Sequence, residues 1–325
     1  MCRYSRKMKN IGIQHLKTAT VKNFAGPIGI RLRRWLQPLL RRALRLGIRR
    51  RVIVEQYPAL EKGKPYIFTS THFFDEDVIA NLISLDRNAW ILFGTTNQLE
   101  YNRQTYAAWL NGMIYIDRMD AQSRKDSVAK MKRILQAGSS ILMFPEGGWN
   151  NTENLLIQKL FPGPWKLAAE TGCQVVPVAA FHDLGADVIY MRYGDPLELG
   201  AMEREEAMGL LRDTMATMLF EMMETHAAPL HREELPSDLH LWHMETRRQA
   251  YLRVPWTRDV WDEELTVYRP HDIVRPEEAW AFVDDIAITP ANAHILAPIL
   301  AERERARRYD FKEYMKRNWS RKDRR

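Results

Sequence analysis

The stretch that decides the fold is Pro65-Tyr-Ile-Phe-Thr-Ser-Thr-His-Phe-Phe-Asp-Glu-Asp-Val-Ile-Ala80. It opens with an apolar run that predicts a short buried strand, and it closes with apolar residues typical of a helix. His72 lies between the two, followed by Asp75, Glu76 and Asp77. A histidine at a strand-to-helix corner, with carboxylates in the first helical turn, predicts a general base and its orienting partner. We assign these roles to His72 and Asp77.

The spacing of this pair constrains its geometry. Five positions along an α-helix turn through about 500°, which leaves two side chains about 140° apart. We therefore expect His72 to precede the helix, and Asp77 to lie inside it and reach back. Asp75 is the competing partner and Glu76 a weaker one, and a structural histidine with satisfied hydrogen bonds is the alternative for His72.

Strands and helices alternate at short spacing on both sides of this stretch. The pattern predicts an α/β fold, with a mixed, mostly buried sheet flanked by helices. The expected strands are 51–54, 65–71, 89–93, 113–116, 140–144, 174–180 and 187–193, and the expected helices are 76–85, 99–110, 120–137, 164–171 and 201–225. Pro177 interrupts one strand, which predicts a sheet edge or a bend there.

Composition excludes several classes of protein. Apolar residues make up 46% of the 325 residues, enough for a sizeable core. With only Cys2 and Cys173, the chain has no disulfide framework and no thiolate zinc site, so we expect a reducing compartment and no metal. No run of 18 apolar residues predicts a transmembrane helix, and the N-terminus lacks the apolar region of a signal peptide.

Charge is distributed unevenly along the chain. Residues 1–54 carry fifteen Lys and Arg residues and no Asp or Glu, and residues 302–325 are also net basic. The region between them is net acidic. A basic head and tail around an acidic body favour an anionic surface as partner over a nucleic acid.

The basic head is amphipathic. Residues 28–51 interleave nine arginines with apolar residues at helical spacing, and Pro38 predicts a kink or a helix–turn–helix. Trp35 suits a membrane interface, while arginines reach anionic headgroups. We expect residues 1–50 to bind the cytoplasmic face of a membrane peripherally. The alternatives are an ordinary amphipathic helix packed on the domain, or nucleic-acid binding, for which no motif is present.

Four stretches in this order resemble the blocks of the glycerophospholipid acyltransferase superfamily (PlsC-like, 1-acylglycerol-3-phosphate acyltransferase). They are His72-x4-Asp77, Gly112-Met-Ile-Tyr-Ile-Asp-Arg118, Phe144-Pro-Glu-Gly-Gly148 and Val175-Val-Pro-Val178. The resemblance covers roughly residues 50–200. It implies the PlsC-like fold, and transfer of a fatty acyl group from acyl-CoA or acyl-carrier protein to a hydroxyl of a lysophospholipid or similar glycerol-phosphate lipid.

The resemblance also implies roles for single residues. It makes His72 the general base oriented by Asp77, and it places Arg118 on the acceptor's phosphate, which a planar guanidinium can clamp. It puts Glu146 in the acceptor site, while Gly147 and Gly148 allow close backbone approach to the substrate. No Gly-x-Ser-x-Gly motif supplies a nucleophile, so direct attack by the acceptor is expected, without a cofactor.

The chain departs from the family pattern near the acceptor site. Thr71 stands where the family usually has Asn, and Gly148-Trp-Asn150 replaces the usual Thr and following residues. The lysine often found after the second strand is missing from Gly94-Thr-Thr-Asn97. These departures keep two alternatives open: a thioesterase or an acyltransferase for a non-phosphate acceptor, and a non-catalytic lipid-binding protein of the same fold.

The chain therefore divides into three predicted regions. Residues 1–50 are the basic membrane-binding segment, and residues 51–227 are the acyltransferase domain. Residues 228–325 are an extension of unknown role, Trp-rich and acidic until a basic tail.

Overall fold

The protein's structure is a computed structural model. It describes residues 19–21, 24, 26–46, 48, 50–73, 76–94, 109–117, 120–148, 150, 155–183, 186–227 and 286–308. The chain forms two compact units, residues 1–267 and 268–325. The first unit holds the sheet, and in the second the structure describes helix α11 (Ala293–Arg308).

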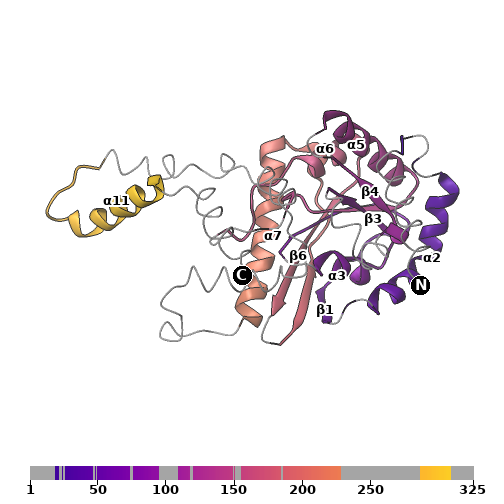
Figure 1. Ribbon diagram of the computed structural model, residues 1–325, viewed down its shortest axis with the longest axis horizontal. Helices are drawn as coiled ribbons and strands as arrows, with labels where there is room; N and C mark the ends of the chain where they lie inside the picture. Colours follow the sequence, from indigo (N-terminus) through magenta and orange to yellow (C-terminus); the bar gives the residue numbers. More distant parts are fainter. Residues whose placement is uncertain are drawn as a thin grey trace, which may run out of the picture. The chain divides into compact units, whose positions relative to one another are not determined.

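A seven-stranded sheet forms the centre of the first unit (Figure 1). Its order is β1-β7-β6-β2-β5-β3-β4, and all neighbours are parallel except β6 and β7, which are antiparallel. The expectation of a mixed α/β sheet is confirmed. The strands are β1 (Arg51–Gln56), β2 (Ile67–Ser70), β3 (Ala89–Phe93), β4 (Met113–Tyr115), β5 (Ser140–Met143), β6 (Val175–Asp183) and β7 (Val188–Tyr193).

Helices cover both faces of this sheet. The connection from β2 to β3 crosses the sheet towards the β4 edge. The connections from β4 to β5 and from β5 to β6 cross it towards the β1 edge. Because such crossovers are right-handed, α3 lies on one face and α5 and α6 on the opposite face. Helix α2 packs on α3, and α7 packs on β6 and α6 (Figure 1). The helices are α2 (Pro27–Arg45), α3 (Asp77–Ser84), α5 (Ala121–Gln136), α6 (Gly163–Thr171) and α7 (Arg204–His226).

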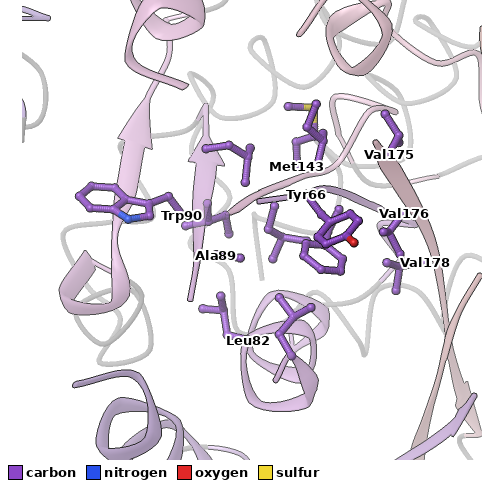
Figure 2. Close-up of a cluster of buried hydrophobic side chains, with 14 of the residues drawn as sticks. Tyr66, Leu82, Ala89, Trp90, Met143, Val175, Val176 and Val178 are labelled. Atoms are coloured by element: carbon purple, nitrogen blue, oxygen red, sulfur yellow. The ribbon is translucent and has the colours of Figure 1, made fainter. Parts of the chain in front are cut away.

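The core is built from the central strands and the helix faces that meet them. Every residue of β2 and β5 is buried, as expected for parallel strands covered on both faces. Leu82 of α3, Trp90 of β3 and Met143 of β5 join this cluster (Figure 2). This explains why the sequence shows continuous apolar runs at these strands instead of alternation.

Pro38 does not interrupt the N-terminal helix. Helix α2 runs from Pro27 to Arg45 with Pro38 inside it, so of the two expectations, a kink or a helix–turn–helix, the helix–turn–helix is wrong. Ile30 and Leu44 are buried on either side of the proline, and this packing holds both halves in one helix. The helix predicted at 99–110 lies mostly outside the described residues.

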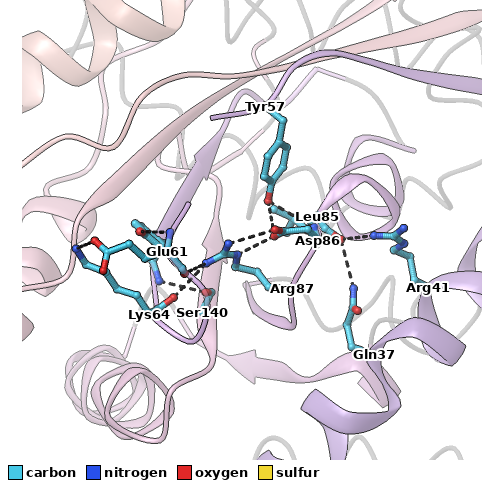
Figure 3. A network of polar contacts seen from close by, with 10 residues as sticks. Gln37, Arg41, Tyr57, Glu61, Lys64, Leu85, Asp86, Arg87 and Ser140 are labelled. Carbon is cyan, nitrogen blue, oxygen red and sulfur yellow. Dashed lines mark hydrogen bonds and ion pairs between the residues drawn. The ribbon is translucent and has the colours of Figure 1, made fainter. Parts of the chain in front are cut away.

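Polar contacts fasten α2 to the end of α3 (Figure 3). Gln37 Nε2 and Arg41 Nη1 both donate to the carbonyl oxygen of Leu85, at 3.3 and 3.0 Å. That carbonyl directly follows the last turn of α3, where helical carbonyls need external donors. Tyr57 donates its hydroxyl to Asp86 in the same network, at 2.6 Å.

Helix α2 has two opposite faces. One packs on the domain through Ile30, Gln37 and Leu44. The other exposes a stripe of large apolar side chains, which we call the α2 stripe: Ile28, Leu32, Trp35, Leu39 and Leu46. Trp35 is 77% exposed. The helix is thus both packed on the domain and left with an apolar face towards solvent.

Pro177 lies within the sheet and not at its edge, so that part of the expectation is wrong. Strand β6 is flanked by β7 and β2. The carbonyl of Pro177 accepts from Gly194 N–H, one residue beyond the end of β7. The N–H and C=O of a strand residue point to the same side, so the position without a donor faces Gly194, just past the end of β7, and not β2. The proline therefore removes no hydrogen bond between β6 and β2.

Candidate active site

The site is set by the register of β2 against β5. These parallel neighbours pair Thr69 with Met143. Three residues further on, at the carboxyl end of each strand, stand His72 and Glu146. In open α/β sheets ligands bind at the topological switch point, beyond the carboxyl ends of two adjacent strands whose connections run to opposite sides of the sheet. Here these strands are β2, which connects towards β3, and β5, which connects towards β6.

His72 and Asp77 form a hydrogen-bonded pair. His72 lies before α3, and Asp77 is the first residue of that helix. Asp77 Oδ2 lies 2.7 Å from His72 Nδ1 and 3.0 Å from the backbone nitrogen of Phe73. Asp77 is fully buried, whereas the His72 side chain is 20% exposed. The structure thus brings the two residues together in the geometry that helix periodicity requires.

Glu76 and Asp75 were the alternatives to Asp77 as the partner of His72. Glu76 forms an ion pair with Arg50, which also reaches Asp187 at 2.8 Å. The carboxylate of Glu76 is therefore bound by the guanidinium of Arg50 and not by the imidazole of His72. Asp75 lies outside the described residues.

The imidazole of His72 has a defined orientation. An ionised Asp77 can only accept, so Nδ1 carries the proton and Nε2 is the nitrogen that can act as a base. The ring stacks on Phe144, with centroids 4.3 Å apart and an interplanar angle of 31°. Packing on one side and a buried carboxylate on the other leave little rotational freedom for the ring.

A second hydrogen-bonded layer lies beneath Asp77. Asn81 Nδ2 donates to Ser70 Oγ and to the backbone oxygen of Asp77, each at 2.9 Å. These bonds tie the first turn of α3 to the last residue of β2. Asn81 was not among the predicted site residues, although a polar residue one turn after Asp77 in an apolar helix is a signal for such a role.

Thr71 has a clear structural role. Its Oγ1 accepts from the backbone nitrogen of Ala180 at 3.0 Å, and its own N–H donates to the carbonyl of Val178 at 3.2 Å. Both partners lie on β6. Thr71 therefore continues the attachment of β2 to β6 up to the residue that precedes His72.

Glu146 is a buried carboxylate beside His72. Its side chain accepts from the backbone N–H groups of His72, at 3.2 Å on Oε1, and of Gln158, at 3.0 Å on Oε2. Only 3% of the residue is exposed. Burial raises the pKa of Glu146 to about 7, against the opposing effect of these two N–H donors and of nearby His72.

The glycines after Glu146 make a tight turn. Gly147 has φ +78°, a conformation that favours glycine, and its N–H donates to the carbonyl of Phe144 at 3.0 Å. Gly148 follows it in the bend and is half-buried. The turn returns the chain to His72, whose carbonyl accepts from Asn150 N–H at 2.8 Å.

Asn150 and Gln158 also belong to the site, and the sequence analysis did not single them out. Asn150 Nδ2 donates to the carbonyls of Leu155 and Leu156, at 2.9 and 3.1 Å. Gln158 Nε2 lies 3.4 Å from Asn150 Oδ1. The only sequence signal was that Asn150 departs from the family pattern after the third block.

One predicted site residue cannot be placed, because Arg118 lies outside the described residues. β4, whose carboxyl end precedes it, is separated from β2 by β3 and β5. Within the described part of the chain, no group of three or more His, Cys, Asp or Glu residues is arranged to hold a metal ion.

The central part of the chain is similar to known acyltransferases. A family model described as Acyltransferase matches residues 51–180. The chloroplastic 1-acyl-sn-glycerol-3-phosphate acyltransferase LPAT1 of Arabidopsis thaliana is 26% identical over 125 residues, which cover 38% of this chain and 33% of the relative. The match thus spans about a third of that relative's length.

Among solved structures, the 1-acyl-sn-glycerophosphate acyltransferase PlsC from Thermotoga maritima gives a TM-score of 0.49 at 14% identity. That comparison covers 71% of this chain and all of the other. The family match spans His72, Asp77, Arg118 and Glu146, and so contains every residue proposed for the site.

Proposed function

We propose that this protein transfers a fatty acyl group from a thioester donor to a hydroxyl of a lysophospholipid, because residues 51–180 match a family model described as Acyltransferase. The observation that carries the proposal is the His72–Asp77 pair at the carboxyl end of β2. A half-buried imidazole whose Nδ1 contacts a fully buried carboxylate is suited to deprotonating a hydroxyl.

The residues support a direct transfer. His72 Nε2 takes the proton of the acceptor hydroxyl as its oxygen attacks the thioester carbonyl. The carbon–oxygen bond forms, the carbon–sulfur bond breaks, and the imidazolium returns its proton to the leaving thiolate. Asp77 stabilises the imidazolium and keeps the ring in the required tautomer.

The acceptor we propose carries a phosphate. The relative from Arabidopsis is named for 1-acyl-sn-glycerol-3-phosphate. The motif that Arg118 ends resembles the family block whose arginine binds the acceptor's phosphate. A guanidinium binds phosphate oxygens with two parallel hydrogen bonds, which a neutral acceptor does not offer. Acyl-CoA or acyl-carrier protein would supply the thioester, and no cofactor is needed.

A panel of acceptors tests this proposal. The full chain is incubated with a labelled acyl thioester and either lysophosphatidic acid, lysophosphatidylcholine or monoacylglycerol, and ester formation and thioester hydrolysis are measured together. We expect ester formation, fastest with lysophosphatidic acid. Hydrolysis with every acceptor and no ester product would instead identify a thioesterase, and no turnover of any thioester would identify a lipid-binding protein.

Arg118→Ala should separate phosphate recognition from chemistry. We expect kcat/KM for lysophosphatidic acid to fall at least tenfold, because the variant loses a charge-assisted contact of about 1.5–3 kcal/mol. Activity towards monoacylglycerol should change less than twofold. Equal losses on both acceptors would contradict a phosphate-binding role, and Arg212→Ala on α7 is a matched surface control.

The α2 stripe supports a membrane-bound state, which we propose to be peripheral and on the cytoplasmic face. No helix among the described residues is long and apolar enough to cross a bilayer. The stripe places Leu32, Trp35 and Leu39 on the side of α2 opposite the packed face. Arg31 and Arg42 lie beside it on the helix, where they can contact anionic headgroups.

Vesicle binding tests the α2 stripe. Leu32→Asp combined with Trp35→Asp should weaken binding to vesicles of phosphatidylglycerol and phosphatidylcholine at least tenfold, because burial of each side chain contributes about 1.5–3 kcal/mol. Leu210→Asp removes an exposed leucine from α7 and should leave binding unchanged. Sedimentation with vesicles measures both variants, and unchanged binding of the double variant would refute the assignment.

A further inference from the structure

We propose that Glu146 is a positioning residue, which holds the peptide group of His72 in place, and not a ligand of the acceptor. This inference rests on the proposed function, because it assigns His72 the role of base. It departs from the acceptor-site role that the family resemblance implies for Glu146, and it is carried by the contacts around the carboxylate.

The main chain at His72 is held from both sides by one turn. Its N–H donates to Glu146 Oε1 at 3.2 Å, and its carbonyl accepts from Asn150 N–H at 2.8 Å. Both holding groups follow β5, the strand paired with β2. The backbone of the base is therefore fixed by a neighbouring strand's loop, while its side chain is fixed by Asp77.

The turn is itself held by the segment that follows it. Gln158 N–H donates to Glu146 Oε2, and Gln158 Nε2 contacts Asn150 Oδ1. Asn150 Nδ2 donates to two carbonyls of the same segment, those of Leu155 and Leu156. The result is a closed set of hydrogen bonds in which Glu146 links the segment at 155–158 to the base.

Glu146 offers almost no surface to an acceptor. Each of its carboxylate oxygens accepts a backbone N–H, and only 3% of the residue is exposed. Each oxygen could accept a second hydrogen bond, but a substrate hydroxyl would have to enter the buried turn to donate it. The geometry therefore favours a carboxylate that stays with the protein through the reaction.

The charge of Glu146 has a second consequence. A carboxylate near His72 stabilises the imidazolium that forms when the base takes its proton. Burial raises the pKa of Glu146 to about 7, so this side chain gains and loses its charge near neutral pH. The titratable groups that face it are His72, which lowers the pKa of Glu146, and Asp77, which raises it.

Kinetics of Glu146→Gln in the full chain test the proposal. The amide of the glutamine keeps the shape of the side chain and one acceptor oxygen. Its NH₂ group, however, faces the backbone N–H of His72 or of Gln158, and two donors repel, so we expect the turn after β5 to shift. We expect kcat for acyl transfer to fall about 10- to 100-fold, with acceptor KM within about twofold of the wild type. A tenfold rise in acceptor KM with unchanged kcat would overturn the proposal in favour of an acceptor ligand.

The pH profile of kcat distinguishes positioning from a merely structural role. The wild type should show a contribution near pH 7 from Glu146, which Glu146→Gln removes, so that the two profiles differ in shape. A residue that only stabilises the fold would scale the profile without changing its shape, and that result would overturn the proposal. Glu170→Gln, at a surface carboxylate paired with Lys132, is the matched control and should leave kcat and profile unchanged.

Asn150→Ala provides a second variant that keeps the carboxylate. The variant loses the hydrogen bonds to the carbonyls of Leu155 and Leu156, which hold the turn that carries Glu146. We therefore expect it to lower kcat and leave acceptor KM unchanged. If Glu146→Gln does not fold, this variant decides: a loss of kcat supports positioning, and wild-type kcat contradicts it.

Protein stability offers a readout that needs no activity. The folded pKa of Glu146 lies above its ordinary value of 4.5. The wild type should therefore lose stability relative to Glu146→Gln as the pH rises from about 4.5 to about 7. A difference in unfolding free energy that is independent of pH would contradict the buried geometry. If the acceptor panel shows no transfer while this pH dependence is present, the proposed function fails and the placement of Glu146 stands.

Discussion

His72→Ala is expected to lower kcat for acyl transfer about 10³-fold. The variant lacks the nitrogen that removes the acceptor's proton, and general-base catalysis typically contributes 10²–10⁴-fold. Binding of the acceptor should be almost unchanged, because the imidazole contacts only the reacting hydroxyl in the proposed mechanism. Initial rates with labelled thioester at saturating acceptor measure the effect.

The control for this variant is His294→Ala, at an exposed histidine on α11. It should leave the rate unchanged. Circular dichroism and the midpoint of thermal unfolding show whether His72→Ala has folded. A folded variant with wild-type activity would remove His72 from the mechanism, and with it the proposed route of transfer.

Asp77→Asn is expected to lower kcat about 10²- to 10⁴-fold. An ionised Asp77 accepts from both His72 Nδ1–H and Phe73 N–H through Oδ2, at 2.7 and 3.0 Å. An amide can present its NH₂ group to one of these donors or stabilise the wrong tautomer of the ring. Because Asp77 is fully buried, water cannot replace the lost acceptor.

Asp213→Asn, at an exposed carboxylate on α7, is the matched control for this change. It should leave kcat unchanged. Wild-type kcat in a folded Asp77→Asn variant would show that the carboxylate does not orient the base. Glu76 would then be examined next, although its ion pair with Arg50 occupies it in the structure.

The order of elements and the geometry of the His72–Asp77 pair could be predicted because both depend on local sequence. Buried parallel strands need continuous apolar runs, and these runs marked β2, β3 and β5. Helix periodicity alone required His72 to precede α3 with Asp77 inside it. Strand hydrophobicity and helix periodicity can be read from local sequence without knowing the strand order.

The surroundings of the pair could not be predicted, because they depend on contacts between distant segments. Only the pairing of β2 with β5 brings Glu146 to His72, and 74 positions separate the two in sequence. Gln158 reaches the same site from a segment with no regular structure. The roles of Asn81 and Asn150 depend on their hydrogen-bond partners, and the sequence alone does not show which groups these partners are.

The role of Glu146 shows the same limit for an inference from resemblance. A family motif places a residue near a substrate, but it does not say whether the side chain faces the substrate or the protein. Here both carboxylate oxygens face backbone N–H groups. If Glu146 stays with the protein as we propose, the acceptor contacts come from other groups, and Arg118 is our proposed phosphate ligand.

The most direct test of the central claim is the stoichiometry of transfer in vesicles that contain lysophosphatidic acid. Wild-type chain and His72→Ala are each given a labelled acyl thioester, and the thiol released is compared with the ester formed. The proposed mechanism predicts one ester for each thiol with the wild type, and about 10³-fold slower formation of both products with the variant. Thiol release without ester, or equal rates for the two proteins, would contradict it.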